Sequence, residues 1–395
     1  MAPPNRVRRR HVFYVAGFDP NGPGRYHRLY SDGARQQAAF DGVAMQVGPR
    51  KREADDTVAW TVQYAPGTAG EVDTAYIFPR WDGIVRDYWW RGLVPQVLDL
   101  FRTSWQYLCT GALWKMYRQS WGPFINAFAP FLLLVLLVPG LYAVVWAGLG
   151  LAAAWAGDEP VAGPAAALAA VLALGAVWAY WARRHWHTQW ILRSYAFTGR
   201  MGRGPGIPAL EERLDAMAEA LCRQVRQGGE RGEDDEVLVV GHSLGTMLAV
   251  SVLARAFRLD PELARRGPAL GLLTLGHLTP MLSDLPAARR FRDELALLAA
   301  VPELCWVDFS DPADAYCFAG VDPVAAAGIT APRAGHPQVR SPDFLAGLSH
   351  AELRRRSQHD VHAQYLCACA QSERYDYFAM TAGPLTLAQR FGAAR

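Results

Sequence analysis

Short apolar runs alternate with longer amphipathic segments over most of the chain. The runs are bounded by Gly, Pro and Asp and have the length of β-strands, whereas 209–227 repeats its apolar residues at helical spacing. Helical and strand-like segments alternate in the second half, which is the order that a parallel sheet with flanking helices requires. We therefore predict an α/β fold. The strand-like runs are 11–16, 43–47, 57–64, 74–78, 237–240, 270–275 and 304–309.

Charged residues disappear from the middle of the chain. None occurs from Gln119 to Gly157, and a second uncharged run covers 161–182. About 20 apolar residues suffice to cross the hydrocarbon core of a bilayer, and helices of ordinary soluble domains rarely run this far without a charge. A pair of buried core helices is the alternative. We favour a transmembrane hairpin with spans at about 124–150 and 161–182.

Aromatic and basic residues near these runs support the same prediction, with a lipid bilayer as partner. Twelve of the 14 tryptophans lie between Trp81 and Trp190, and Trp favours the two interfaces of a bilayer. The acidic segment 158–160 joins the two runs, while cations flank the hairpin on its outer sides. The positive-inside bias then places the joining loop outside and both termini in the cytoplasm. The flanking cations are Lys115, Arg118, Arg183, Arg184 and Arg193.

The hairpin divides the sequence of a single domain. Residues 1–92 and 191–395 each contain part of the strand pattern, and 93–190 forms a membrane-associated insertion. Because both ends of the insertion lie on the same side of the bilayer, the two parts can build one sheet in the cytoplasm. Segment 93–121 is rich in apolar residues and has few charges. It is either a helix lying along the membrane surface or a helix packed on the domain, and both interpretations stay open.

Composition argues against several classes of function. The formal charge of +3 is small for 395 residues, and no Lys/Arg block carries interleaved aromatics, so nucleic acid is not an expected partner. The six cysteines are scattered without zinc-ligand spacing, and we expect neither a metal nor an organic cofactor. Free thiols in a reducing compartment fit this cysteine pattern.

The motif Gly-His-Ser-Leu-Gly at 241–245 carries the clearest chemical signal. It follows the apolar run 237–240 and precedes a helix-length apolar segment, in the order strand, sharp turn, helix. A turn tight enough to lift the Ser243 hydroxyl clear of a sheet brings backbone against backbone at Gly241 and Gly245, where side chains would clash. We therefore predict a nucleophile elbow with Ser243 at its apex. An ordinary glycine-rich turn with an incidental serine is the alternative.

This elbow resembles that of the α/β-hydrolase superfamily, particularly its lipases and esterases. The resemblance implies a mostly parallel sheet with flanking helices, here interrupted by the transmembrane hairpin. It also implies a triad in chain order serine, acid, histidine, and an oxyanion hole made of two backbone N–H groups. One donor is the residue after the nucleophile, Leu244. The other comes from a glycine loop after an early strand, which suggests Phe18, although a plain strand-to-helix turn is the alternative for this loop.

Three aspartates after the elbow are candidates for the acid that orients the histidine. Asp308 belongs to the predicted strand 304–309, and Asp311 precedes a proline in a turn. In the resembling fold the acid sits in the loop beyond the strand end, so we favour Asp314. The other two aspartates remain alternatives.

The base must be a histidine later in the chain. We favour His362, which follows a possible last strand at 337–344 and lies near the start of an apolar helical stretch. His359, three residues earlier on a similar helix face, and the loop-borne His336 remain alternatives. His242 is expected to pack beside the elbow, because neighbouring side chains point apart.

Together these residues predict a membrane-anchored serine hydrolase. Ser243 attacks a carboxylic ester and forms an acyl-enzyme, assisted by His362 and Asp314, and a tether beside an apolar, Trp-rich segment favours a lipid-like substrate. Two alternatives stay open: a catalytically inactive scaffold on the same fold, and an acyltransferase that passes the acyl group to an alcohol other than water. A transporter is not favoured, because the two apolar runs offer no charged path for a polar solute.

Overall fold

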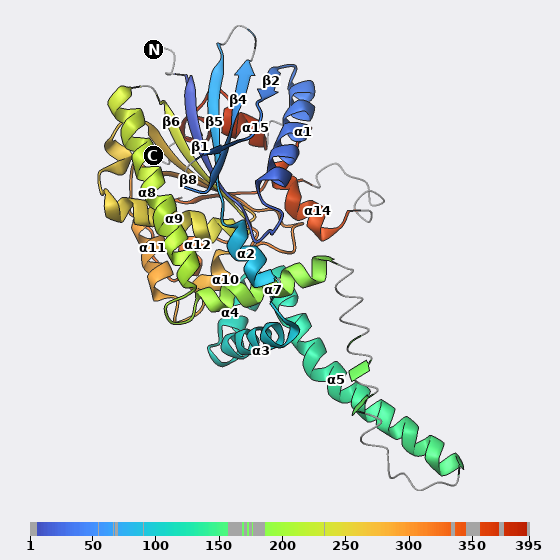
Figure 1. Cartoon of the computed structure of the whole chain (residues 1–395). Helices are drawn as coiled ribbons and strands as arrows, with labels where there is room; N and C mark the ends of the chain where they lie inside the picture. The colour runs from blue at the N-terminus through green and yellow to red at the C-terminus, as the bar shows by residue number, and fades with distance from the viewer. Residues whose placement is uncertain are drawn as a thin grey trace.

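Strands from 1–92 and from 191–395 form one sheet in the computed structural model (Figure 1). Its nine strands are β1 (Arg9–Val15), β2 (Ala44–Val47), β3 (Lys51–Glu53), β4 (Thr57–Ala65), β5 (Val72–Pro79), β6 (Glu236–His242), β7 (Ala269–Leu275), β8 (Cys305–Phe309) and β9 (Gln338–Arg340). They run in the order β2-β4-β5-β1-β6-β7-β8-β9, with β3 paired to β4. From β5 to β9 all neighbours are parallel, while β2, β3 and β4 join through antiparallel pairs. The predicted mostly parallel sheet is therefore confirmed.

The structure describes residues 6–392 apart from one long gap and several short ones. Between 157 and 185 only 168–169, 172–173 and 176 are described, so most of the second predicted span, 161–182, lies outside the described residues. The short gaps are 54, 66, 68–69, 90, 233, 333–335, 345–355 and 371–374.

Two hydrophobic cores cover the two faces of the sheet. Alternate residues of β1 point to opposite faces, so Phe13 and Val15 lie in one core and Val12 and Tyr14 in the other. Helices α8 (Pro208–Arg231), α9 (Gly245–Leu259) and α11 (Arg289–Ala299) pack into the first core. The second core contains α1 (Pro23–Asp41), α15 (Tyr377–Ala382) and α16 (Leu387–Phe391). Burial on both faces explains why the centre of β6 is continuously apolar.

One strand escaped prediction because it carries no apolar signal. The three residues of β3 are polar and exposed, and the strand pairs only with β4 at the margin of the sheet. Short helices complete the body. They are α2 (Asp82–Trp89), α10 (Thr279–Ser283), α12 (Pro323–Ala326) and α14 (Gln358–Ala363), with 3-10 turns at Leu263–Arg265 and Gln364–Leu366.

The described part of the insertion forms helices beyond the carboxyl ends of the parallel strands (Figure 1). These are α3 (Leu93–Cys109), α4 (Ala112–Gln119), α5 (Trp121–Ala156) and α7 (Trp186–Met201). The expectation of a single helix over 93–121 was wrong, because Gly111 adopts φ 72° and breaks it into α3 and α4. The first predicted span, 124–150, falls within α5, which extends away from the body (Figure 1). No helix in the described part of the chain combines the length and apolarity needed to cross a membrane.

Candidate active site

The turn between β6 and α9 holds Ser243 in a strained backbone conformation. Its φ of 58° lies in the left-handed region, which residues with a Cβ rarely adopt. Backbone hydrogen bonds fix the turn on both sides: the Ser243 N–H donates to the Leu275 carbonyl at 2.9 Å, and the Ser243 carbonyl accepts from the Thr246 N–H at 3.0 Å. Strain that is held by its surroundings in this way is concentrated at functional sites.

Gly241 and Gly245 allow the turn to be this tight. A Cβ on Gly245 would lie 2.2 Å from the carbonyl oxygen of Val15, and a Cβ on Gly241 would lie 2.7 Å from the carbonyl oxygen of Gly245. Both distances are too short for any side chain. The backbone-to-backbone packing that the motif predicted is therefore present.

Asp314 and His362, which are 48 residues apart, form a buried pair: His362 Nδ1 donates to Asp314 Oδ2 at 2.7 Å. A capping box between Ser357 and Asp360 starts the helix α14 that carries His362. Burial raises the pKa of the Asp314 carboxyl, but the charge and hydrogen bond of His362, helped by the Tyr316 N–H, outweigh burial and hold this pKa below its usual value. An ionised Asp314 accepts the hydrogen bond from Nδ1 and so fixes this nitrogen as the donor, which leaves Nε2 as the ring nitrogen that can accept a proton.

Ser243 and His362 line the same cavity, whose volume is ≈ 50 Å³, and their reactive atoms are Ser243 Oγ and His362 Nε2. Both atoms are buried, and neither has a hydrogen-bond partner among the described residues. Hydrogen bonds between a nucleophile and its base are often formed only when a substrate is bound. The cavity is further lined by Gly17, Phe18, Asp19, Arg25, Tyr26, Leu29, Trp190, His242, His359, Ala363 and Leu366.

The loop after β1 lies directly beside the serine. A Cβ on Gly17 would be 3.0 Å from Ser243 Cβ and 3.4 Å from Ser243 Oγ. The loop backbone is fixed, because the Gly17 carbonyl accepts from the Asp19 N–H at 2.9 Å and the Phe18 carbonyl accepts from Trp190 Nε1 at 2.6 Å. On the other side of the serine, Leu244 directly precedes α9, where unpaired N–H groups give a helix its partial positive charge. The backbone of the loop after β1 and the start of α9 therefore both lie next to Ser243.

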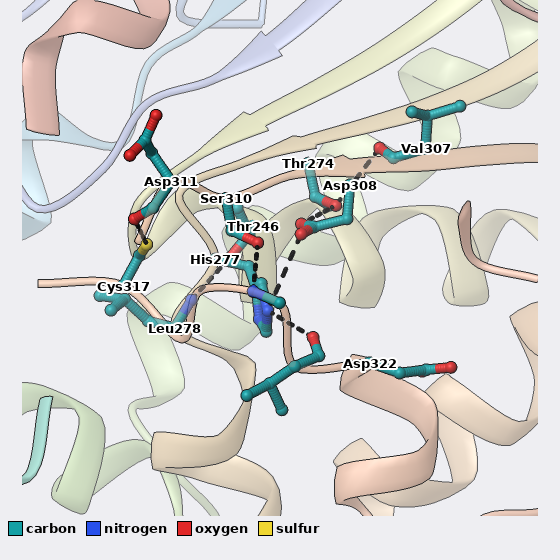
Figure 2. Close-up of polar contacts among 12 residues, drawn as sticks. Thr246, Thr274, His277, Leu278, Val307, Asp308, Ser310, Asp311, Cys317 and Asp322 are labelled. Atoms are coloured by element: carbon teal, nitrogen blue, oxygen red, sulfur yellow. Dashed lines mark hydrogen bonds and ion pairs between the residues drawn. The ribbon is translucent and has the colours of Figure 1, made fainter. Parts of the chain in front are cut away.

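Asp308, one of the two other candidate acids, is engaged elsewhere (Figure 2). Its Oδ1 accepts from Thr274 Oγ1 at 2.7 Å, and its Oδ2 lies 3.8 Å from Nε2 of His277. That nitrogen donates to the Val321 carbonyl at 2.9 Å. Burial raises the pKa of the Asp308 carboxyl. Neither Asp308 nor His277 lines the cavity at Ser243.

Asp311, the second alternative acid, organises its own loop. Its carboxylate accepts from the backbone N–H of Ala313 at 2.9 Å and from that of Phe344 at 2.7 Å. Of the three candidate aspartates, Asp314 is the one whose carboxylate contacts a candidate histidine.

The alternative histidines occupy different places. His359 lines the cavity, where its Nε2 lies 3.4 Å from a guanidinium nitrogen of Arg25. His336 instead packs its ring edge-on against Trp306, with the ring centres 6.4 Å apart, and it does not line the cavity. The structure therefore leaves His359 near the serine but pairs His362 with the acid.

His242, the residue before Ser243, supports the backbone of His362. Its Nε2 donates to the His362 carbonyl at 2.9 Å, and the two rings lie 5.0 Å apart. Burial, and then the nearby charge of His362, lower the pKa of His242 to about 3. His242 is thus a neutral donor that fixes the position of the neighbouring histidine.

Two residues near the pair were not expected from the sequence. Trp190 of α7 lies with its ring 5.8 Å from those of His359 and His362 and donates to the Phe18 carbonyl. Gly276, directly after β7, has φ 56°, and a Cβ there would be 3.3 Å from Asp314 Oδ2. A glycine closing a predicted strand was a detectable signal, whereas nothing local to Trp190 indicates this contact.

The start of α5 braces the loop that carries the acid. Asn126 Nδ2 donates to the Ala315 carbonyl at 2.8 Å. Gly122 lies so close to this loop that a Cβ on it would be 2.6 Å from the same carbonyl oxygen. Helices of the insertion therefore contact both the acid loop and the histidine.

Comparisons with known proteins add nothing to the geometry of this site. Neither a protein-family model, nor a curated protein, nor a solved structure matches this chain. Among the described residues, no group of three or more His, Cys, Asp and Glu side chains could hold a metal ion.

Proposed function

We propose that the protein is a serine hydrolase that cleaves carboxylic esters through an acyl-enzyme on Ser243. The observation that carries this proposal is the meeting of three features at one cavity: a serine on a strained turn, a histidine nitrogen without a partner among the described residues, and a carboxylate 2.7 Å from the other histidine nitrogen. The chain order Ser243, Asp314, His362 matches the order of the α/β-hydrolase superfamily, to which we propose the chain belongs.

Each residue has one task in the proposed reaction. His362 Nε2 removes the Ser243 proton as Oγ attacks the ester carbonyl, and ionised Asp314 stabilises the imidazolium that forms. The N–H groups of Leu244 and Phe18 stabilise the tetrahedral oxyanion. His362 then gives its proton to the departing alcohol, and a water activated by the same nitrogen releases the acid and restores Ser243.

The cavity favours a compact group at the reacting carbon. A volume of ≈ 50 Å³ accepts a few non-hydrogen atoms, which is enough for a short acyl group. Leu29, Trp190 and Leu366 give part of its lining an apolar character along which a longer chain can extend. We propose an amphiphilic, lipid-like ester as substrate. The insertion would anchor the protein to the membrane in which this ester is presented. The membrane location is supported by the uncharged sequence from Gln119 to Gly157.

A fluorophosphonate probe on membranes containing the full chain tests the proposal, because it reacts with an activated serine without any assumption about substrate. We expect Ser243→Ala and His362→Ala to reduce labelling at least about 10³-fold. His359→Ala and Ser341→Ala, an exposed loop serine, serve as controls and should label like the intact protein. If folded intact protein is never labelled, the inactive scaffold replaces the hydrolase. If labelling succeeds but ester products carry an added alcohol rather than water, the protein is an acyltransferase.

A further inference from the structure

Helix α3 turns its apolar stripe away from the protein. Its large apolar residues recur at intervals of three and four, share one face and are exposed; Trp105, for example, is 59% exposed. The opposite face is buried and includes the polar residues Thr103 and Ser104, with Thr103 packed against Gly199 of α7. A helix on a water-facing surface has the reverse arrangement. The exposed stripe consists of Val94, Leu98, Phe101, Trp105 and Leu108.

Helix α4 and the first turns of α5 continue this exposed set. Trp114 is 63% exposed, and its ring stacks on Tyr117 at 5.2 Å. Tyr117 in turn contacts the exposed Trp121 edge-on at 5.5 Å. The helices α3, α4 and α5 contact one another, and we group their exposed apolar residues as one surface. We call it the aromatic surface: Val94, Leu98, Phe101, Trp105, Leu108, Trp114, Tyr117, Trp121 and Ile125.

The exposed charges on α3 and α4 have one sign. Arg102, Lys115 and Arg118 are exposed on the same two helices. The only acidic residue from 93 to 121 is Asp99, which is buried and accepts from Arg91 at 2.7 Å. Within 93–121 the surface thus has exposed aromatic rings, exposed cations and no exposed carboxylate, which is complementary to anionic lipid headgroups.

We propose that the aromatic surface lies in the headgroup region of a lipid bilayer. Trp and Tyr rings, with one polar edge and a large apolar body, favour this zone over both water and hydrocarbon. The surface is continuous with α5, which begins at Trp121 inside it and belongs to the stretch without charged residues from Gln119 to Gly157. This continuity and the unbalanced positive charge favour lipid over a second copy, whose identical cations would face one another.

The proposal does not depend on the serine chemistry, yet it indicates where the site lies relative to the membrane. Ile125 lies in the aromatic surface, and the next residue, Asn126, holds the acid loop at Ala315. The loop carrying Asp314 therefore lies within one helical turn of the lipid-facing residues. An ester dissolved in the membrane would approach the catalytic body from this end.

Depth-resolved fluorescence quenching of the full chain in phosphatidylcholine–phosphatidylglycerol vesicles tests the proposal. Lipids brominated near the headgroup quench tryptophans at that depth, and acrylamide quenches those in water. The double variant Trp105→Phe/Trp114→Phe changes two of the three tryptophans of the aromatic surface conservatively and should reduce the quenching by shallow bromines to the share that Trp121 contributes. The matched control is Trp155→Phe, at an exposed ring near the far end of α5, which should preserve that shallow quenching.

Three outcomes are possible, and each decides the matter. Loss of shallow lipid quenching in the double variant supports the proposal. If the double variant instead loses acrylamide quenching, the two rings face water. If it loses emission that neither agent quenched, protein, such as a second copy, covers the two rings. Either of these results overturns the proposal. Fluorophosphonate labelling of Ser243 in the same vesicles is measured in parallel, so that failure of the membrane surface and failure of the hydrolase proposal are distinguishable.

Discussion

The sheet and the aromatic surface treat the same kinds of residue in opposite ways. In β6 every apolar side chain is buried, as is every apolar side chain of α9 except the terminal Leu259, and the polar Ser243 hydroxyl lies in a small cavity at the end of the strand. In α3 the polar Thr103 and Ser104 are buried, and the apolar stripe with Trp105 is exposed. The sheet completes its burial within the chain, whereas α3 and α4 bury one face and leave the large apolar side chains of the other face exposed.

The difference shows where each region's stability originates. Packing at close-packed density stabilises the sheet, so that added atoms are not tolerated. The exposed helices tolerate local change, because few neighbours surround them. Predictions that pair one position in each region test this contrast directly.

The largest effect is expected at the elbow. Gly245→Ala places a Cβ 2.2 Å from the carbonyl oxygen of Val15, which backbone on both sides cannot relieve. We expect the loss of more than about 4 kcal/mol of stability and little folded protein. Gly148→Ala on α5 is the counterpart, because a Cβ there meets no described atom within 4 Å. It should stabilise the helix by up to about 1 kcal/mol. Recovery of folded protein and thermal melting measure both, and equal tolerance of the two changes would contradict the contrast.

The next largest effect concerns the acid. Asp314→Asn keeps the size of the side chain but removes the charge that fixes the proton on His362 Nδ1. We expect fluorophosphonate labelling to slow on the order of 10³–10⁴-fold, while the melting temperature changes little. Asp311→Asn, in the same loop but bonded to backbone N–H groups, is the control and should keep labelling within about tenfold. A larger loss from Asp311→Asn than from Asp314→Asn would exchange their roles.

The seam between the two regions contains a carboxyl that opposes folding at neutral pH. Burial raises the pKa of Asp284 to about 6, against attraction from Lys115 and a hydrogen bond from Gln119 of α4. Because the folded state binds this proton more tightly than the unfolded chain, wild-type stability falls as pH rises through the window from about 4 to about 6. Asp284→Asn removes this cost, which is at most about 3 kcal/mol.

The variant should therefore melt like the wild type near pH 4 and at a higher temperature above pH 7. Asp293→Asn, at an exposed position of α11, should leave melting unchanged at both pH values. Thermal melting across this range is the measurement. A gain for Asp284→Asn that is equal at both pH values would exclude the titration as its cause.

The smallest effect concerns the contact between the insertion and the site. Trp190→Phe retains a ring beside His362 but loses the hydrogen bond to the Phe18 carbonyl. A single such bond contributes about 1 kcal/mol, so labelling of Ser243 should slow about five- to tenfold at unchanged melting temperature. Trp105→Phe, in the exposed stripe, should leave the labelling rate as it is. Equal rates for all three proteins would show that α7 does not position the loop after β1.

Local patterns predicted the parts of the fold that are themselves local. The elbow was predictable because the strand, the turn with Gly241 and Gly245, and the helix follow one another in sequence. β3 was missed because its three polar residues pair at the margin and bury nothing. The break at Gly111 was missed because apolar spacing continues across it, and only the left-handed φ of this glycine reveals the turn.

The candidate site needed contacts between distant residues. Chain order and loop position sufficed to favour Asp314 and His362, which the structure pairs across 48 residues. Chain order carries no information on Trp190, because its contact with Phe18 spans 172 residues and depends on how α7 packs. The helical segment with His362 also holds His359, and only the direction of each ring distinguishes them.

The hydrogen bond from Asn126 to the Ala315 carbonyl makes the insertion a structural support of the site. A stretch of about a hundred residues between two halves of a sheet looks like a removable accessory, and protein engineers would be tempted to replace it with a short linker to obtain a smaller protein. Such a minimal version would keep every strand and the residues Ser243, Asp314 and His362. It would also lose the wall that supports the acid loop and the tryptophan above the histidine. The same helices therefore have two tasks: they form the exposed surface of the insertion, and they also support the site.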